Sequence, residues 1–170
     1  MKALVALALG LALAAPAHAR EFVAEVGNFR CLTDGVRAPG KSFYIFHAKR
    51  GALARAVRKT ERGKLGKGYP VGTILQLFPF EAMAKRGGRF NREGNGWEYF
   101  KLHVAADGTT EILARGKSEV TGLTGTSCQD CHQNTAADHD SVCEFVIGAS
   151  GLGLTDEQIR AFQASDARCK

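Results

Sequence analysis

The motif Cys128-Gln-Asp-Cys131-His132 constrains this chain more than any other feature of its sequence. Two cysteines at this spacing reach the two vinyl groups on one edge of a porphyrin, and the adjacent histidine then places an imidazole nitrogen on the iron. Two alternatives explain the motif less well. A thioredoxin-like redox pair does not need a histidine at position 132, and a zinc site needs a second pair of ligands. The motif therefore predicts one covalent haem c. Cys128 and Cys131 are its thioether positions, and His132 is the proximal iron ligand.

The N-terminus predicts export. Lys2 precedes an apolar run over residues 3–16, and residues 17–19 (Ala-His-Ala) have the small-x-small pattern that signal peptidase reads. A short apolar run that ends in such a pattern is typical of a secretory signal rather than of a membrane span. We expect residues 1–19 to be a signal peptide and residues 20–170 to be one domain, periplasmic or secreted. No membrane span is expected after cleavage.

The charge of the chain bears on its partners. The formal net charge is +6, and residues 49–67 carry eight lysines and arginines against one carboxylate, Glu61. Such a basic surface steers acidic redox partners or small anions. We interpret this stretch as a solvated helix and loop. An exported protein without a recognised nucleic-acid motif is not expected to bind nucleic acid.

Hydrophobic patterning predicts a β-rich α+β domain. Aromatic and β-branched or alternating segments predict four strands, at residues 42–47, 73–78, 97–104 and 111–114. Asp107-Gly108 predicts a hairpin between the last two. Alternation along residues 97–104 places one set of side chains on one face of that strand (Trp97, Tyr99, Lys101 and His103) and the other set on the opposite face (Glu98, Phe100, Leu102 and Val104). Helical spacing predicts a helix over residues 51–60, a single helical turn at 81–85, and a C-terminal helix capped by Thr155 and Gln158. The fold class is a single domain with an antiparallel sheet, short helices and a late haem-binding CxxCH loop.

The second axial position of the iron has several candidates. Electron-carrying cytochromes c supply a methionine after the motif, whereas none follows it here. The upstream candidates are Met83, His47, His103, a lysine, or no residue at all. We interpret Met83 as a core residue, and the two histidines as hydrogen-bonded or exposed residues on strands. An open sixth position is therefore expected, which suits binding or redox conversion of a small molecule.

Several motifs resemble the cytochrome P-460 family, which includes the cytochromes c′-beta. They are Tyr69-Pro-Val-Gly72-Thr73-Ile-Leu, Glu81-Ala-Met-Ala-Lys-Arg86, Gly94-Asn-Gly-Trp97-Glu-Tyr-Phe100, and the haem motif followed by Asp140-x-Val142. The likeness covers roughly residues 40–145. It implies a β-rich, usually dimeric, single-haem protein with a histidine ligand and an open distal site for nitrogen species. P-460 proper oxidises hydroxylamine, whereas the c′-beta type binds nitric oxide.

The same resemblance bears on the distal side. P-460 proper cross-links a lysine to the haem edge, and the corresponding position here is Leu77, which cannot form that bond. The resemblance instead suggests an apolar distal cap from Phe78, Phe80 and Phe90, as in the c′-beta type; plain hydrophobic core is the alternative interpretation of these residues.

Three functions follow from these residues. The leading one is an exported mono-haem c-type cytochrome whose five-coordinate iron binds or converts nitric oxide or a related small molecule. The second is a six-coordinate electron-transfer cytochrome that serves a redox partner protein, with Met83, His47 or His103 as the sixth ligand. The third is peroxidase-type activity with His103 or Glu98 as the distal acid–base group. Whether the protein is an enzyme stays open.

Three cysteines remain beyond the motif: Cys31, Cys143 and Cys169. An oxidising compartment permits one disulfide and leaves one thiol. Cys31–Cys169 joins the two ends of the chain, whereas Cys143–Cys169 fastens the terminal helix beside the haem motif. A disulfide between two subunits is a third alternative.

Overall fold

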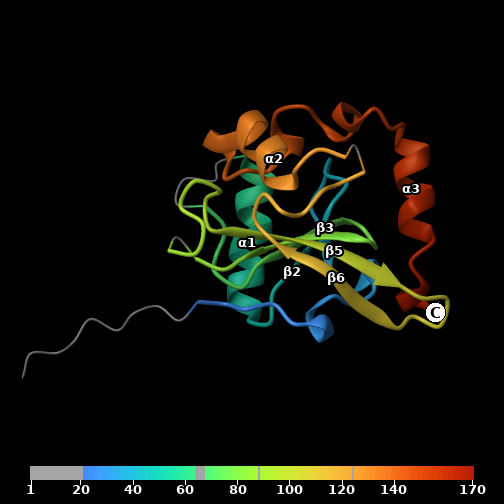
Figure 1. Ribbon diagram of the computed structural model, residues 1–170. Helices are drawn as coiled ribbons and strands as arrows, with labels where there is room; N and C mark the ends of the chain where they lie inside the picture. Colours follow the sequence, from blue (N-terminus) through green and yellow to red (C-terminus); the bar gives the residue numbers. More distant parts are fainter. Residues whose placement is uncertain (1–20, 64–67, 88, 124) are drawn as a thin grey trace, which may run out of the picture.

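The structure, a computed structural model, describes residues 21–63, 68–87, 89–123 and 125–170. The predicted signal peptide over residues 1–19 lies outside the described residues. The described chain forms one α+β domain, with an antiparallel sheet at its centre and helices around it (Figure 1). No helix in these ranges is long and apolar enough to cross a membrane.

The sheet has six strands, and each pairs antiparallel with its neighbours in the sequence. The strands are β1 (Val36–Arg37), β2 (Tyr44–Phe46), β3 (Ile74–Phe78), β4 (Glu81–Lys85), β5 (Trp97–Val104) and β6 (Thr110–Gly116). The four predicted strands correspond to β2, β3, β5 and β6. The predicted turn joins β5 to β6, with Gly108 in the left-handed region at φ 87°.

Strand β4 corrects the sequence analysis, which predicted a helical turn at Glu81–Lys85. Its residues are mostly good helix formers, but a segment of five residues is too short to nucleate a helix by itself. The segment instead pairs with β5 along its whole length, from Glu81 opposite Lys101 to Lys85 opposite Trp97. Pairing with β3 and β5 therefore outweighs the local preference of these residues.

The α-helices are α1 (Arg50–Arg62), α2 (Cys128–Ala136) and α3 (Asp156–Ala164). Helix α1 buries Ala52, Ala56 and Thr60 on one stripe and ends at Gly63, whose left-handed conformation (φ 60°) is typical of a helix C-terminus. Helix α3 has the predicted capping box of Thr155 and Gln158. Short 3-10 helices and loops complete the chain.

Each face of the sheet carries its own apolar cluster. The face called here the helix face carries Leu75, Met83 and Tyr99, which lie side by side on β3, β4 and β5 and pack with residues of α1 and α2. The opposite face carries Phe100 and Leu102, which pack with residues of the N-terminal segment. The predicted alternation of side chains along β5 is thereby confirmed.

The two ends of the described chain meet. Cys31 and Cys169 form a disulfide, which is one of the pairings that the sequence left open. Beside it, the Asp166 carboxylate accepts a hydrogen bond from the Leu32 amide at 2.9 Å and pairs with Arg168 at 2.8 Å. Cys143 stays a free thiol.

Candidate functional site

Helix α2 brings the three motif residues to one side of the helix. The sequence analysis placed the motif in a loop, but Ser127 caps a helix here, its hydroxyl accepting a hydrogen bond from the Asp130 amide at 3.2 Å. Residues at positions i, i+3 and i+4 share one face of an α-helix. The helix therefore presents Cys128, Cys131 and His132 together, in an arrangement that a flexible loop does not fix.

That side of α2 faces a cavity, which is bounded by residues of β3, β4 and β5 and flanked by residues 142–152. Its empty volume is about 860 Å³, including the part open to solvent. The part of it that the centre of a water molecule can occupy is about 140 Å³. The cavity is lined mainly by apolar side chains: Phe43, Leu75, Leu77, Phe78, Ala82, Met83, Phe100, Val142, Ile147 and Leu152. Its polar lining consists of Glu81, Tyr99, Cys128, Cys131, His132, Cys143 and Glu144.

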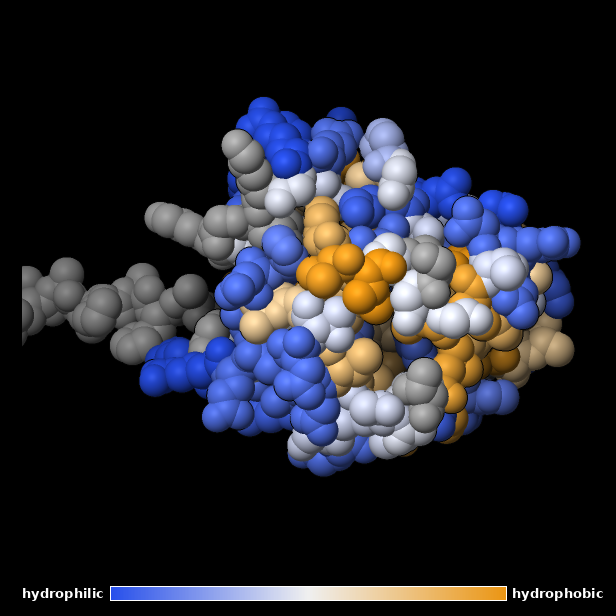
Figure 2. All heavy atoms as spheres, turned by 90° about the horizontal axis from the view of Figure 1, so that it is seen from above, coloured by the Kyte–Doolittle hydropathy of each residue, from blue (hydrophilic) through white to orange (hydrophobic). Residues whose placement is uncertain are grey.

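The surface above this region is apolar at its centre. Figure 2, which views the molecule from the α2 side, shows hydrophobic side chains gathered in the middle of this face with polar ones around them. Three exposed apolar residues belong to the loop before α2 and to the segment after it: Leu123, Val146 and Leu152.

His132 has a defined orientation. Its Nδ1 lies 2.7 Å from the carbonyl oxygen of Ser141, and its ring packs 5.2 Å from the Tyr99 ring. A carbonyl oxygen only accepts hydrogen bonds, so Nδ1 carries the proton and Nε2 keeps its lone pair. Burial lowers the pKa of His132, although the bond to Ser141 opposes this. His132 is therefore a neutral imidazole with one nitrogen committed to the backbone and the other available as a ligand.

Two cysteines of the cavity, Cys128 and Cys143, lie in surroundings that keep their thiols protonated. Burial, with Glu81 and Cys131 nearby, raises the pKa of the Cys128 thiol to about 11. Burial likewise raises the pKa of Cys143, beside Cys131, to about 12. Reactive thiols of disulfide oxidoreductases have lowered pKa values, because the thiolate is the nucleophile. The raised pKa of Cys128 disfavours the thioredoxin-like alternative.

The zinc alternative also lacks support within the described residues. The one group of three metal-type side chains with converging atoms is Cys31, Asp166 and Cys169. The two sulfur atoms of that group are bonded to each other, so they are not thiolate ligands. The motif cysteines and His132 belong to no such group in this part of the chain.

The residues predicted for the distal side divide into two sets. Phe78 and Met83 line the cavity, and so does Leu77. Phe80 instead stacks on Phe78 with ring centroids 5.3 Å apart. Phe90 lies under Arg86, 4.0 Å from the guanidinium carbon.

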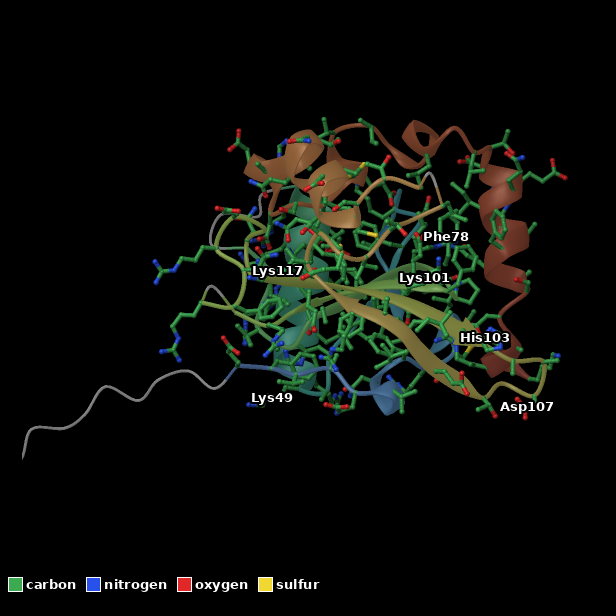
Figure 3. The ribbon with its side chains drawn as sticks, in the orientation of Figure 1. Lys49, Phe78, Lys101, His103, Asp107 and Lys117 are labelled. Atoms are coloured by element: carbon green, nitrogen blue, oxygen red, sulfur yellow. A yellow bond between two sulfur atoms is a disulfide. The ribbon has the colours of Figure 1, made fainter. Side chains whose placement is uncertain are left out.

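Neither candidate histidine lines the cavity. His103 is exposed on β5, close to the hairpin that Asp107 marks in Figure 3, and His47 binds the Val71 carbonyl at 3.0 Å. The expectation that the histidines are exposed or hydrogen-bonded is confirmed. Phe80, Phe90 and His103, which were predicted for the distal side, are not among the described residues that line the cavity.

Tyr99 is a site residue that the sequence analysis did not single out. It is 2% exposed, lines the cavity, and its hydroxyl has no hydrogen-bond partner among the residues that the structure describes. Burial, with Cys143 and Cys128 nearby, raises its pKa well above the usual range. Buried hydroxyl groups normally have a hydrogen-bond partner, so we expect the Tyr99 hydroxyl to bond to a group that occupies the cavity. The alternation along β5 already placed Tyr99 with Trp97, but nothing in the sequence identified the cavity on that face.

Comparisons with protein-family models, with curated proteins and with solved structures found no match to this chain.

Proposed function

We propose that this protein is an exported mono-haem c-type cytochrome, with the porphyrin held in the cavity beneath α2. The observation that carries the proposal is the state of His132: its Nδ1 is committed to the Ser141 carbonyl, which leaves Nε2 free beside two cysteines on the same helix face. Iron-ligating histidines are typically oriented in this way, by a hydrogen bond from the other ring nitrogen.

The lining of the cavity fits such a group. Cys128 and Cys131 lie on one turn of α2, and each thiol would add across one vinyl group of the haem, the sulfur bonding to one carbon and the hydrogen going to the other. The apolar residues of the helix face suit a flat aromatic macrocycle, and the unpaired Tyr99 hydroxyl is available to donate a hydrogen bond to it. When bound, the haem supplies an iron centre that takes up ligands or electrons.

The first test is covalent attachment. The mature protein, produced in a host with a c-type maturation system, is denatured and separated on a gel that is stained for haem. We expect the stain to stay with wild-type protein and to be lost in Cys128→Ala/Cys131→Ala. Cys143→Ala is the matched control, because Cys143 faces the same cavity but lies outside the motif; it should keep the haem. Haem that is lost from denatured wild-type protein contradicts the proposal.

Ligand binding at open iron is the activity that the cavity supports best. No histidine other than His132 is among the described residues that line it, and most of the lining is hydrocarbon. An apolar site of this kind favours small uncharged ligands such as nitric oxide over ions. No described lining residue is a lysine, and Leu77 faces the cavity, so the cross-linked haem of P-460 proper is not part of the proposal.

Electron transfer is the second candidate, and the position of Met83 favours it. Met83 is 6% exposed, lies in the core cluster of the helix face, and also lines the cavity. Its thioether is therefore the one methionine sulfur among the described residues that line the cavity with His132. The two residues named for peroxidase-type chemistry have no comparable place, because His103 is exposed and Glu98 pairs with Arg115 at 2.8 Å on β6.

Carbon monoxide distinguishes the two candidates. Reduced protein with an open site gives a high-spin spectrum that shifts on addition of the gas, and Met83→Leu leaves this response unchanged. Reduced protein with Met83 on the iron gives a low-spin spectrum that resists the gas, and Met83→Leu converts it to a responsive one. The second result would show that electron transfer, and not ligand binding, is the function of the iron.

Export and partners belong to the same proposal. The disulfide between Cys31 and Cys169 supports an oxidising compartment such as the periplasm. A redox partner protein and a homodimer, which the resemblance to P-460 proteins implies, stay predictions that size measurement and reduction kinetics can test.

A further inference from the structure

The carbonyl that orients His132 sits in an unusual turn. Asp140 and Ser141 both have positive φ angles, 53° and 56°. Residues with side chains adopt this left-handed region only at a cost in free energy, and two in succession must be held there by their surroundings. The direction of the Ser141 carbonyl, and hence the bond to His132, depends on whatever holds this turn.

A buried ion pair holds it. The Asp140 carboxylate accepts a hydrogen bond from the Lys85 ammonium of β4 and another from the Tyr69 amide at 2.7 Å. Lys85 and Asp140 are only 7% and 9% exposed. The backbone oxygen of Asp140 also accepts a bond from the Trp97 indole nitrogen at 2.7 Å. The side chain and the carbonyl of Asp140 are thus fixed to the loop before β3 and to two strands of the sheet.

The Asp140 carboxylate fits beside Gly68 only because that residue has no side chain. A β-carbon at Gly68 would lie 2.6 Å from Oδ2 of Asp140 and would overlap it. Gly68 itself has φ 77°. The glycine at position 68 therefore leaves room for the buried carboxylate of Asp140. A turn that served only to reverse the chain would need no buried charge.

We propose that Lys85 and Asp140 are positioning residues for His132: their ion pair fixes the Asp140–Ser141 turn so that the Ser141 carbonyl holds Nδ1 of His132 protonated and aims Nε2 into the cavity. The inference rests on the proposed function only for what Nε2 then binds. The pair acts through the turn and touches neither the imidazole nor the cavity, since neither residue lines it.

A merely structural role makes a different prediction, and the molecule offers a matched control. Asp166 is also a buried carboxylate that pairs with a cation, Arg168, and accepts a backbone amide, that of Leu32. It lies beside the Cys31–Cys169 disulfide, and among the described residues its hydrogen bonds and ion pair do not involve His132. Asp166→Asn should lower stability as Asp140→Asn does, but only Asp140→Asn should disturb His132.

The test reads the imidazole directly. In the full mature chain, ¹⁵N NMR of labelled histidine gives the tautomer of His132 when no haem is attached, and the iron–histidine stretching band of the reduced protein gives its hydrogen bonding when haem is attached. Wild type should show Nδ1 protonated. Asp140→Asn and Lys85→Met should shift the Nδ1 signal toward the average of both tautomers and lower the stretching frequency, while Asp166→Asn matches wild type.

Folding failure is covered by a third variant. Lys85→Met/Asp140→Asn leaves no ion buried alone, and replacing both partners of a buried pair is usually far better tolerated than removing one. It should fold and still show the His132 shift. An Nε2-protonated His132 in wild type, or wild-type signals in the folded double variant, overturns the inference. Protein without covalent haem refutes the proposed function instead, and the tautomer measurement still stands.

Discussion

Removing the disulfide between Cys31 and Cys169 should cost a large part of the stability of this protein. The two cysteines are 138 residues apart, so the bond closes almost the entire described chain into one loop. Chain-entropy theory for a loop of this length gives ~5 kcal/mol of stabilisation, by restricting the unfolded state. Domains of this size have only ~5–15 kcal/mol in total. The double variant Cys31→Ser/Cys169→Ser should therefore fold but be marginal.

The native contacts of the two ends explain why the variant should still fold. The Leu32 amide keeps its bond to Asp166, and the Arg168 guanidinium donates to the Phe29 carbonyl at 3.1 Å. These contacts do not depend on the sulfur–sulfur bond. The loss should consequently come from a more expanded unfolded state, which also raises the dependence of the unfolding free energy on denaturant.

Urea unfolding followed by circular dichroism measures both effects. We expect a loss of about 3–5 kcal/mol together with a steeper denaturant dependence, and a melting temperature about 10–15 °C lower. Cys143→Ser removes a free thiol and serves as the control, with a much smaller change. A double variant whose midpoint and slope equal those of wild type refutes the reasoning, because it means that the ends are not covalently joined.

Three further predictions follow from single contacts. The pKa of Asp166 is lowered, since its bonds to Arg168 and Leu32 outweigh the effect of burial. Wild type should therefore be more stable than Asp166→Asn above the ordinary pKa of the carboxyl, and this advantage should vanish as pH falls through the pKa of the folded state. Unfolding free energies measured over a range of acid pH test this. Trp97→Phe leaves the Asp140 carbonyl without its donor at 2.7 Å and should cost ~2 kcal/mol in urea unfolding. Gly68→Ala forces a β-carbon against Asp140 at φ 77° and should cost ~1–3 kcal/mol; thermal stability equal to wild type contradicts this.

Periodicity and turn chemistry predicted the fold where one local signal dominated. Alternation placed the two faces of β5 correctly, and Asp107-Gly108 located the hairpin, because both depend on neighbouring residues alone. Strand β4 was missed because its residues favour a helix locally, and only its pairing with β3 and β5 decides otherwise. Pairing with distant segments cannot be read from five residues.

The candidate site was predictable in its chemistry but not in its surroundings. The spacing of Cys128, Cys131 and His132 identified the motif because the chemistry demands those residue types at those positions. The resemblance suggested Phe90 for the distal side, whereas its ring packs with Arg86 and is not among the described residues that line the cavity. The Ser141 carbonyl that orients His132 depends on a left-handed turn, and Asp140-Ser141 carries no glycine to signal one.

The central claim is that the motif on α2 carries a covalent haem, and intact-mass spectrometry of denatured mature protein tests it most directly. The account predicts one species, heavier than the polypeptide by a single haem, with the added mass found on the peptide that contains Cys128 and Cys131. A chain at the polypeptide mass after production with the maturation machinery, or added mass on a peptide that contains Cys143 alone, contradicts it.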